Sequence, residues 1–349
     1  MSAGARAILA AAALFLAAAA APAADTRSVT DSADRRVDVP ARVERVYAAG
    51  GPASIFLYTL APEKMLGWNR PLSPEERAFV PSRYAELPTL GRLTGRGNTA
   101  NVEAVLAARP DLIFDYGSLT ETYRSLADRI QRQIGVPYLL IAGSLAAIPD
   151  VYTRVGDLLG VGDRGRELGR YAERVLAETD RRVARVPAAQ RPSVYYGRGP
   201  KGLETAAHGS INVESLERLG ARNVAEKLGV AGVSVVSPEQ VLAWDPEIII
   251  AIDPGFVTSV RADPVWKNVR AVRAGRVYLV PQAPFPWVDF PPSVNRLIGL
   301  KWLGRIFYPE QFPEDLRQET RVFYTLFYHQ APTEAQLDAL LAGVERPRP

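Results

Sequence analysis

Short apolar runs alternate with amphipathic segments along most of the chain. The apolar runs have the length of buried strands, and several end at a glycine, as in DLIFDYG and PSVYYGRG. Between them, segments such as SIFLYTLAPEKMLG repeat apolar residues with helical spacing. Strands that alternate with helices predict an α/β fold with mostly parallel sheets. The expected strands lie at 42–50, 111–117 and 134–141, and again at 192–199, 247–255 and 274–281.

One helix–strand unit is written twice in the chain. NVEAVLAARPDLIF, residues 101–114, has a near copy in SPEQVLAWDPEIII, residues 237–250. In each copy a glutamate, Glu103 or Glu239, stands seven places before a proline. A first strand precedes each copy and a last strand follows it, so four landmarks recur in the same order. This ordered repetition predicts two equivalent α/β lobes.

The segment between the two copies predicts how the lobes are joined. Residues 148–187 carry apolar positions at helical spacing with dense arginine and glutamate between them. We expect a long bridging helix there, interrupted near 160–165, with an N-terminal lobe at 25–147 and a C-terminal lobe with C-terminal helices at 188–349. A helical connector is a stiff hinge, so we expect a ligand cleft between lobes that hold a nearly fixed spacing.

The N-terminus has the layout of a secretory signal peptide, residues 1–24. Arg6 precedes an uncharged apolar run that ends in small residues, which favours cleavage after Ala23 or Ala24. The alternative is an uncleaved membrane anchor, because a run of this length can span a bilayer. The chain has no cysteine, which excludes a lipid-anchored cysteine, disulfides and thiolate metal sites. We therefore expect a soluble protein, not a lipoprotein, in the periplasm.

Composition narrows the class of protein. Apolar residues make up 47% and charged residues 23% of 349, as in ordinary globular proteins. Lys and Arg number 42 against 38 Asp and Glu, an excess too small and too evenly spread for nucleic-acid binding. We expect a monomer that binds a small ligand.

Loops that follow predicted strands carry the candidate ligand site, since ligands of open α/β sheets bind at the carboxyl ends of strands. Glycine-rich backbone together with fixed cations suits a compact anion. The alternative is that Gly-Arg-Gly forms an ordinary exposed turn. The candidate ligand-binding residues are Gly50, Gly51, Arg92, Asn98, Thr99, Tyr116, Arg198, Lys201, Thr205, His208 and Trp287.

A late aromatic loop, residues 282–304, adds a second kind of candidate surface. Phe285, Trp287, Asp289 and Phe290 would lie near the mouth of the cleft, where an aromatic shelf suits a chelate or macrocycle. In the alternative interpretation, these rings close the bottom of the second lobe.

Enzyme motifs have little support in this sequence. GRGPKG, residues 197–202, matches the dinucleotide-binding pattern, but Pro200 stands where a helix should start, so an NAD-dependent oxidoreductase is a remote alternative. His208 and His329 are the only histidines, and neither a zinc-hydrolase motif nor a nucleophile elbow is present. We expect no catalytic residue, no cofactor and no directly bound metal.

The leader, the two α/β halves and the paired patterns resemble the periplasmic substrate-binding proteins of ABC importers for ferric siderophores, haem and vitamin B12. GSINVESLERLGARNVA, residues 209–225, is similar to the segment that opens the second lobe's first helix in that family. The resemblance implies that Glu103 and Glu239 dock into arginines of the ABC permease, whose partner ATPase hydrolyses ATP. Glutamates in a first helical turn are also favoured by the helix dipole, and the two roles are compatible.

The resemblance leaves the cargo divided. It implies an iron complex first, a ferric siderophore or similar metal chelate, whose negative charge suits arginines. Its relatives include molybdate- and tungstate-binding proteins, and the glycine-rich loops with Arg198 and Arg92 fit a small tetrahedral oxyanion. Vitamin B12 and haem rank below these two.

Overall fold

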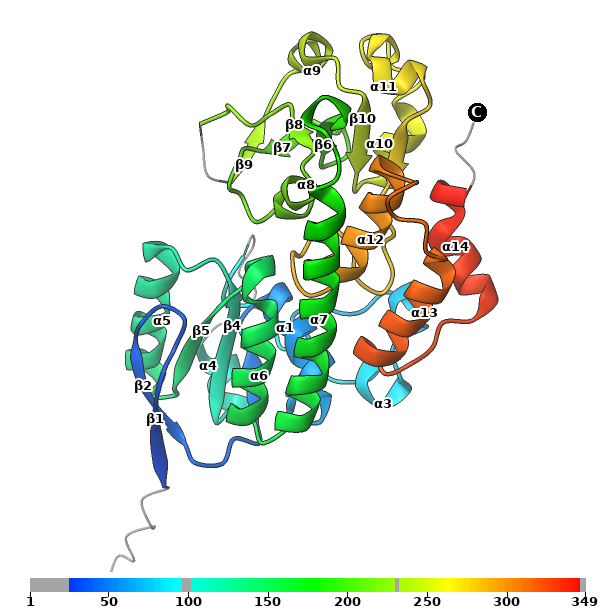
Figure 1. The fold of residues 1–349 in the computed structure, drawn as a ribbon. Helices are drawn as coiled ribbons and strands as arrows, with labels where there is room; N and C mark the ends of the chain where they lie inside the picture. The colour runs from blue at the N-terminus through cyan, green and yellow to red at the C-terminus, as the bar shows by residue number, and fades with distance from the viewer. Residues whose placement is uncertain (1–24, 96–101, 230–231, 346–349) are drawn as a thin grey trace, which may run out of the picture.

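A computed structural model describes residues 25–95, 102–229 and 232–345 (Figure 1). The expected signal peptide, residues 1–24, lies outside these ranges, as do Asn98 and Thr99. Two α/β units are stacked in Figure 1, the N-terminal lobe below and the C-terminal lobe above. The α/β fold with mostly parallel sheets, expected from the pattern of the chain, is confirmed.

The N-terminal lobe is built on a parallel sheet in the order β3-β4-β5. Its strands are almost entirely buried, which explains their continuous apolar runs. The lobe contains β1 (Thr26–Thr30), β2 (Arg36–Pro40), β3 (Val46–Ala48), α1 (Gly51–Leu60), η1 (Pro62–Lys64), α2 (Pro74–Arg77), α3 (Ser82–Ala85), α4 (Val102–Ala107), β4 (Leu112–Gly117), α5 (Glu121–Ile134), β5 (Tyr138–Ala142) and η2 (Leu145–Ala147).

The C-terminal lobe repeats this plan with a parallel sheet in the order β11-β10-β6-β8. β10 lies between β6 and β11 as β4 lies between β3 and β5, which matches the order of the repeated landmarks. The lobe contains η3 (Ala188–Gln190), β6 (Ser193–Gly197), β7 (Glu204–Ala206), α8 (Glu214–Arg218), β8 (Arg222–Asn223), β9 (Val233–Val235), α9 (Pro238–Trp244), β10 (Ile248–Ala251), α10 (Pro254–Ser259), η4 (Trp266–Asn268), α11 (Arg270–Arg273) and β11 (Val277–Leu279).

The connector between the lobes is a helix pair. α6 (Ile148–Leu158) ends at a turn, and α7 (Gly162–Val183) runs back beside it and continues into the upper lobe (Figure 1). The predicted interruption is thus a reversal, and α7 alone spans the two lobes. Glycine allows the close packing of the pair, because a Cβ on Gly165 would stand 2.4 Å from the carbonyl oxygen of Tyr152. At about 1.5 Å per residue, the 22 residues of α7 measure roughly 33 Å.

The C-terminal helices, which the sequence assigned to the second lobe, also cover the first. They are α12 (Arg296–Phe307), α13 (Leu316–Phe327) and α14 (Glu334–Glu345), and α13 lies beside α3 in Figure 1. Tyr58 in α1 donates its hydroxyl to the carbonyl of Tyr328 at 2.6 Å, and the ring of Phe79 lies 5.6 Å from that of Tyr324. Aromatic burial therefore ties the end of the chain to α1.

Candidate ligand-binding cleft

The carboxyl ends of β4 and β5 meet a cavity of about 430 Å³ between the lobes. Its N-terminal side follows β4 and β5, and its C-terminal side includes α8. Ligands of open α/β sheets bind at this edge, where strand ends meet helix N-termini. The lining is mostly small and polar: Gly117, Ser118, Leu119, Ala142, Gly143, Ser144, Gly209, Ser210, Ile211, Glu214 and Glu217.

Helix α1 brings its N-terminus to the same edge, at the end of β3. Gly50 is its N-cap residue and, as a glycine, has no side chain that could cap the helix. A Cβ on Gly50 would stand 2.5 Å from Oγ1 of Thr94, and one on Gly51 would stand 3.2 Å from Cγ of Pro291. A side chain at Gly50 would therefore displace Thr94, and one at Gly51 would crowd Pro291. The helix dipole and the N–H groups of Gly51 and Ala53 favour an anion at this point, whereas Pro52 between them has no N–H.

Arg198 follows β6 in the opposite lobe and is only 6% exposed. Its Nε lies 3.2 Å from Oδ2 of Asp289 in an ion pair, and the centre of its guanidinium lies 5.5 Å from the ring centre of Phe290. Within the described residues, neither its Nε nor its Nη1 has a hydrogen-bond partner. Since a buried guanidinium without hydrogen bonds is costly, these donors are suited to a ligand.

The ion-pair partner of Arg198, Asp289, is itself held by hydrogen bonds. It is fully buried and accepts hydrogen bonds from the hydroxyl of Tyr196 and from Nδ2 of Asn212, both at 2.8 Å. Burial, together with the charge of Asp289, raises the pKa of Tyr196 well above its usual value, so the phenol stays protonated and donates. Two neutral donors and one cation thus stabilise the carboxylate.

The residues after Asp289 connect Arg198 to helix α1. Phe290 packs on the guanidinium, and Pro291 packs on Gly51. Ser293 then donates its hydroxyl to the carbonyl of Pro52 at 2.9 Å. Phe290 is 60% exposed and has a φ of +68°, so a strained, open position lies between the two candidate anion-binding elements.

A second buried carboxylate lies behind the glycine loop. Asp115 in β4 accepts from Oγ1 of Thr94 at 3.3 Å and from the hydroxyl of Tyr138 at 3.1 Å. Burial raises its pKa to about 6, against the lowering effect of these donors. Each lobe therefore has a buried carboxylate, Asp115 or Asp289, behind its candidate anion-binding element.

A buried ion pair clamps the lobes together beside the cavity. Arg296 is fully buried, and its Nη1 lies 2.7 Å from Oε2 of Glu214. Its Nη2 also donates to the carbonyl of Gly143. Glu214 in turn accepts from the backbone N–H of Leu145, with its two oxygens at 2.9 and 3.0 Å. Side chains of the C-terminal half thus hold the turn after β5 in the N-terminal lobe.

Three other sequence-predicted residues, Arg92, Lys201 and His208, lie in loops. Arg92 is half-buried. The next residue, Leu93, donates its N–H to the carbonyl of Ala49 at 2.7 Å, so the loop that carries Arg92 lies beside Gly50. His208 is exposed and contacts Glu217 at 3.1 Å. Lys201 is exposed on the turn after Arg198.

Three predicted residues are core side chains. Trp287 is fully buried and donates Nε1–H to the hydroxyl of Tyr324 at 3.0 Å, so it packs under the C-terminal helices instead of facing a ligand. Thr205 is fully buried in β7. Tyr116 stacks on Phe56 at 4.8 Å, and burial raises its pKa to about 12. The aromatic loop divides accordingly, with Phe285 in the core and Phe290 exposed.

Sequence reasoning missed Thr94, Asp115, Glu214 and Arg296 as parts of the cleft. Asp115 was visible as the polar residue in the strand DLIFDYG, where a buried carboxylate is unusual. Glu214 and Arg296 carry no local signal, because each resembles an ordinary charged residue at the start of a helix.

Glu103 and Glu239 occupy matching places in the two lobes. Each is exposed in the first turn of its helix, α4 or α9. Ser237 caps α9 by accepting from Gln240 N–H at 3.1 Å. Both carboxylates are therefore favoured by a helix dipole and available to a partner surface.

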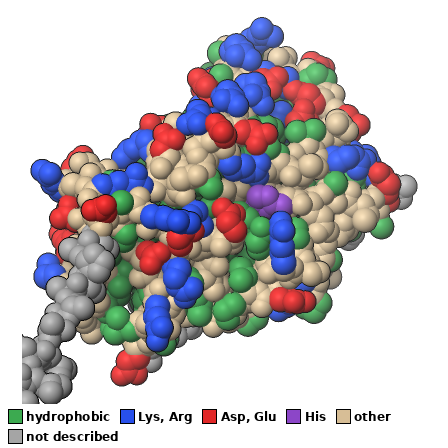
Figure 2. Space-filling model, turned by 90° about the horizontal axis from the view of Figure 1, so that it is seen from below, with side chains coloured by type: hydrophobic (Ala, Val, Ile, Leu, Met, Phe, Trp, Pro, Cys, Tyr) green, Lys and Arg blue, Asp and Glu red, His purple; other side chains and the backbone are tan. Residues whose placement is uncertain are grey.

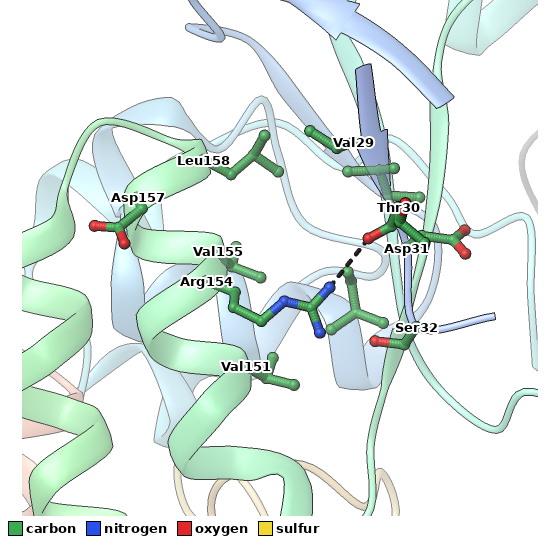
Figure 3. A pocket seen from close by; sticks show the side chains of 11 residues that line it. Val29, Thr30, Asp31, Ser32, Val151, Arg154, Val155, Asp157 and Leu158 are labelled. Atoms are coloured by element: carbon green, nitrogen blue, oxygen red, sulfur yellow. Dashed lines mark hydrogen bonds between the residues drawn. The ribbon is translucent and has the colours of Figure 1, made fainter. Parts of the chain in front are cut away.

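Outside the cleft, a cavity of about 370 Å³ lies between β1, β5 and α6 (Figure 3). Its floor is apolar, and Arg154 reaches across it to the carbonyl of Thr30 at 3.0 Å. In the described parts of the chain, no cluster of three or more His, Cys, Asp or Glu side chains could hold a metal ion. The face seen in Figure 2 mixes basic and acidic side chains.

Two α/β lobes that face each other across a polar cleft and share one spanning helix define a bilobal ligand-capture protein. The family described as periplasmic binding protein matches residues 78–284. The chain belongs to this family, whose members are solute-binding components of ABC transporters and not enzymes. Among the described residues, no helix is both long enough and apolar enough to cross a membrane.

Similar proteins include several solved structures. An ABC transporter solute-binding protein from Sulfurospirillum deleyianum is 30% identical with a TM-score of 0.82, covering 90% of this chain and 99% of that one. The molybdate-binding protein MolA of Haemophilus influenzae is 26% identical over 86% of this chain and 91% of its own length. Its molybdate-bound structure has a TM-score of 0.73 at 23% identity, covering 88% and 99% of the two chains. The haem uptake protein IsdE of Staphylococcus aureus is 21% identical over 61% of this chain and 72% of its own.

Proposed function

We propose that the cleft captures a compact tetrahedral oxyanion of the molybdate or tungstate type and delivers it to an ABC permease. The observation that carries this proposal is Arg198, a buried guanidinium with unoccupied donors. It lies across Phe290 and Pro291 from the N-terminus of α1, whose N-cap residue is Gly50. Fixed donors from two lobes suit a small anion that needs hydrogen bonds on several sides.

The relatives and the lining of the cavity support the same ligand class. MolA, which aligns over most of both chains, is named for molybdate binding. The cavity is lined largely by glycine, serine and alanine, and Phe285 and Trp287 are packed in the core. Of these aromatic side chains, Phe290 is therefore the one left exposed for stacking on a macrocycle.

An iron complex, which the sequence ranked first, is the second candidate. The exposed ring of Phe290 favours it, because a planar chelate could stack there beside the guanidinium. IsdE, a haem uptake protein, also aligns with part of the chain.

Delivery would use the exposed glutamates on α4 and α9. Glu103 and Glu239 carry one negative charge on each lobe, and a permease with matching arginines would engage both at once. The mature protein would act as a monomer in the periplasm after removal of residues 1–24.

Ligand-dependent thermal unfolding and titration calorimetry test the proposal. The purified protein, lacking residues 1–24, is mixed in turn with molybdate, tungstate, a ferric catecholate siderophore, haem and cobalamin. A ligand at 100 times its dissociation constant adds about 2.7 kcal/mol to the free energy of unfolding. We expect molybdate and tungstate to raise the midpoint by several degrees. A shift with the ferric siderophore alone would reject the oxyanion as the ligand and support the iron complex.

A further inference from the structure

We infer that each lobe docks on the permease through an exposed aliphatic side chain that lies beside its glutamate. In the N-terminal lobe, Leu106 accompanies Glu103. In the C-terminal lobe, Val235 accompanies Glu239. The inference rests on the proposed delivery to an ABC permease and specifies the chemistry of the partner surface. It does not depend on which cargo the cleft binds.

Large apolar side chains are rarely exposed on this protein. Among the described residues, the exposed ones are Val235 at 78%, Phe290 at 60%, Leu106 at 45% and Val322 at 41%. Phe290 lies over Arg198, but Leu106 and Val235 each lie within four residues of a candidate docking glutamate, one in each lobe. Single exposed apolar side chains are ordinary on protein surfaces, whereas their position beside both glutamates needs a reason.

Helix α4 in the lower lobe of Figure 1 combines one charge with an apolar outer face. Its sequence, VEAVLA, contains a single charged residue, and its exposed residues are Glu103, Ala104, Leu106 and Ala107. Leu106 follows Glu103 by three residues, so the two side chains share one face of the helix, about 5 to 6 Å apart at Cβ. An exposed helix normally directs several charged side chains toward water, as α5 does with Glu121 and Arg129. The outer face of α4 is therefore suited to contact with a partner.

In the upper lobe, the aliphatic side chain comes from the strand that precedes α9. β9 ends at Val235, and Glu239 lies in the first turn of α9. Val236 packs against the core of this lobe, so its neighbour Val235 faces the other way, toward water. Four residues of chain span at most about 14 Å, so Val235 and Glu239 fit within one contact area. Glu239 is the single charged residue of α9, whose other exposed residues are Gln240 and Ala243.

The repeated sequence does not by itself account for both exposed side chains. Leu242 occupies the place of Leu106 in the second copy, but it is half-buried against the core of the C-terminal lobe. Val235 lies outside the repeated unit and supplies the exposed aliphatic group of that lobe. The same combination of a carboxylate and an aliphatic side chain thus arises in two different ways, which indicates a shared function and not merely a copied residue.

A carboxylate next to an aliphatic side chain specifies a cation next to apolar groups on the permease. When the partner covers the aliphatic side chain, water leaves the neighbourhood of the ion pair, and the attraction between the charges is stronger and less screened there. Apolar contacts exclude water around the central contacts of many interfaces in the same way. Binding to the permease therefore has a salt-sensitive part from the glutamates and a salt-resistant part from Leu106 and Val235.

Cosedimentation of the protein lacking residues 1–24 with vesicles that carry the permease tests the inference. Leu106→Ser combined with Val235→Ser should weaken binding at least about 10-fold at both about 0.05 M and about 0.5 M salt, because apolar contacts are not screened. Glu103→Lys combined with Glu239→Lys should instead weaken binding most at low salt. Val322→Ser removes an exposed aliphatic side chain from α13 and is the control that should leave binding unchanged. Urea denaturation midpoints should not change in the serine variants, because the substituted side chains are exposed.

Each outcome assigns the two surfaces differently. A serine double variant that binds as tightly as the Val322→Ser variant, while the lysine double variant fails to bind, would overturn the inference and keep the docking glutamates. Unchanged binding in the lysine double variant would reject the docking role within the proposed function. Binding of the unaltered protein to vesicles without permease would assign the aliphatic side chains to lipid and overturn the inference. Self-association that the serine substitutions abolish would assign them to a second copy of the chain and would overturn it as well.

Discussion

Nε of Arg198 lies 3.2 Å from Oδ2 of Asp289, yet Nε and Nη1 make no hydrogen bond with any described residue. The pair joins two loops of the C-terminal lobe and leaves part of a buried guanidinium uncommitted. Under the proposed function, the charge of Arg198 stabilises Asp289 and its uncommitted donors bind the ligand, so the two functions are separable.

Substitution of Arg198 should separate these functions. Arg198→Lys retains a charge near Asp289 but lacks the planar donor fork, so we expect molybdate affinity to fall about 10- to 100-fold with a small change in stability. Arg198→Ala leaves Asp289 buried without its cation and should cost about 3 to 5 kcal/mol of stability as well. Calorimetry and urea denaturation measure the two effects. Unchanged affinity in the lysine variant would show that the ligand does not bind to Arg198.

Phe290 provides a test of backbone strain. Its φ of +68° is a left-handed conformation that glycine adopts without cost. Phe290→Gly and Phe290→Ala both remove the ring over Arg198, but only alanine keeps the strain. We expect the glycine variant to be about 1 kcal/mol more stable than the alanine variant in chemical denaturation. An alanine variant of equal or greater stability would show that the loop does not hold this conformation in solution.

The clamp between the lobes predicts a strong stability effect. Arg296→Met removes a fully buried cation and leaves Glu214, whose side chain is 28% exposed, without its ion pair, so we expect a loss of about 1.5 to 3 kcal/mol in the free energy of unfolding. Adding Glu214→Gln should recover part of that loss, because the uncompensated charge is then removed. Urea denaturation of both single variants and the double variant gives the interaction free energy between the two side chains. Strict additivity would mean that the two side chains do not interact in solution.

Asp115 predicts a pH dependence of stability. Its pKa is raised from 3.8 to about 6, so the folded state holds this proton more tightly than the unfolded state. Its stabilising contribution is present below the ordinary value and is lost as the pH rises through about 6, a change of about 3 kcal/mol. Asp115→Asn should flatten the stability profile between about pH 4 and pH 7. Asp38→Asn, at an exposed position in β2, is the control, and an equal slope in both variants would contradict the assignment.

Charge reversal tests the docking glutamates. Glu103→Lys combined with Glu239→Lys should abolish permease-dependent uptake while ligand affinity stays within about twofold, because both residues are exposed at helix starts outside the cavity lining. Transport into cells or vesicles carrying the permease is the measurement. Glu121→Lys with Glu226→Lys, also exposed, one on each lobe, is the matched control. A parallel fall in affinity would reject the docking role.

The sequence by itself determined the two-lobed α/β plan, since buried strands and amphipathic helices are periodic over a few residues and the repeated unit displays that period twice. Gly50, Gly51 and Arg198 were predicted as candidate site residues from local sequence, because they follow predicted strands. Contacts between distant parts of the chain were decided only by the tertiary structure. Tyr58 meets Tyr328 from 270 residues away, and Arg296 meets Gly143 from 153 residues away. No local pattern specifies such pairs. Trp287 was misassigned to the cleft for the same reason, because its burial depends on α13, a helix that returns across the fold from the end of the chain.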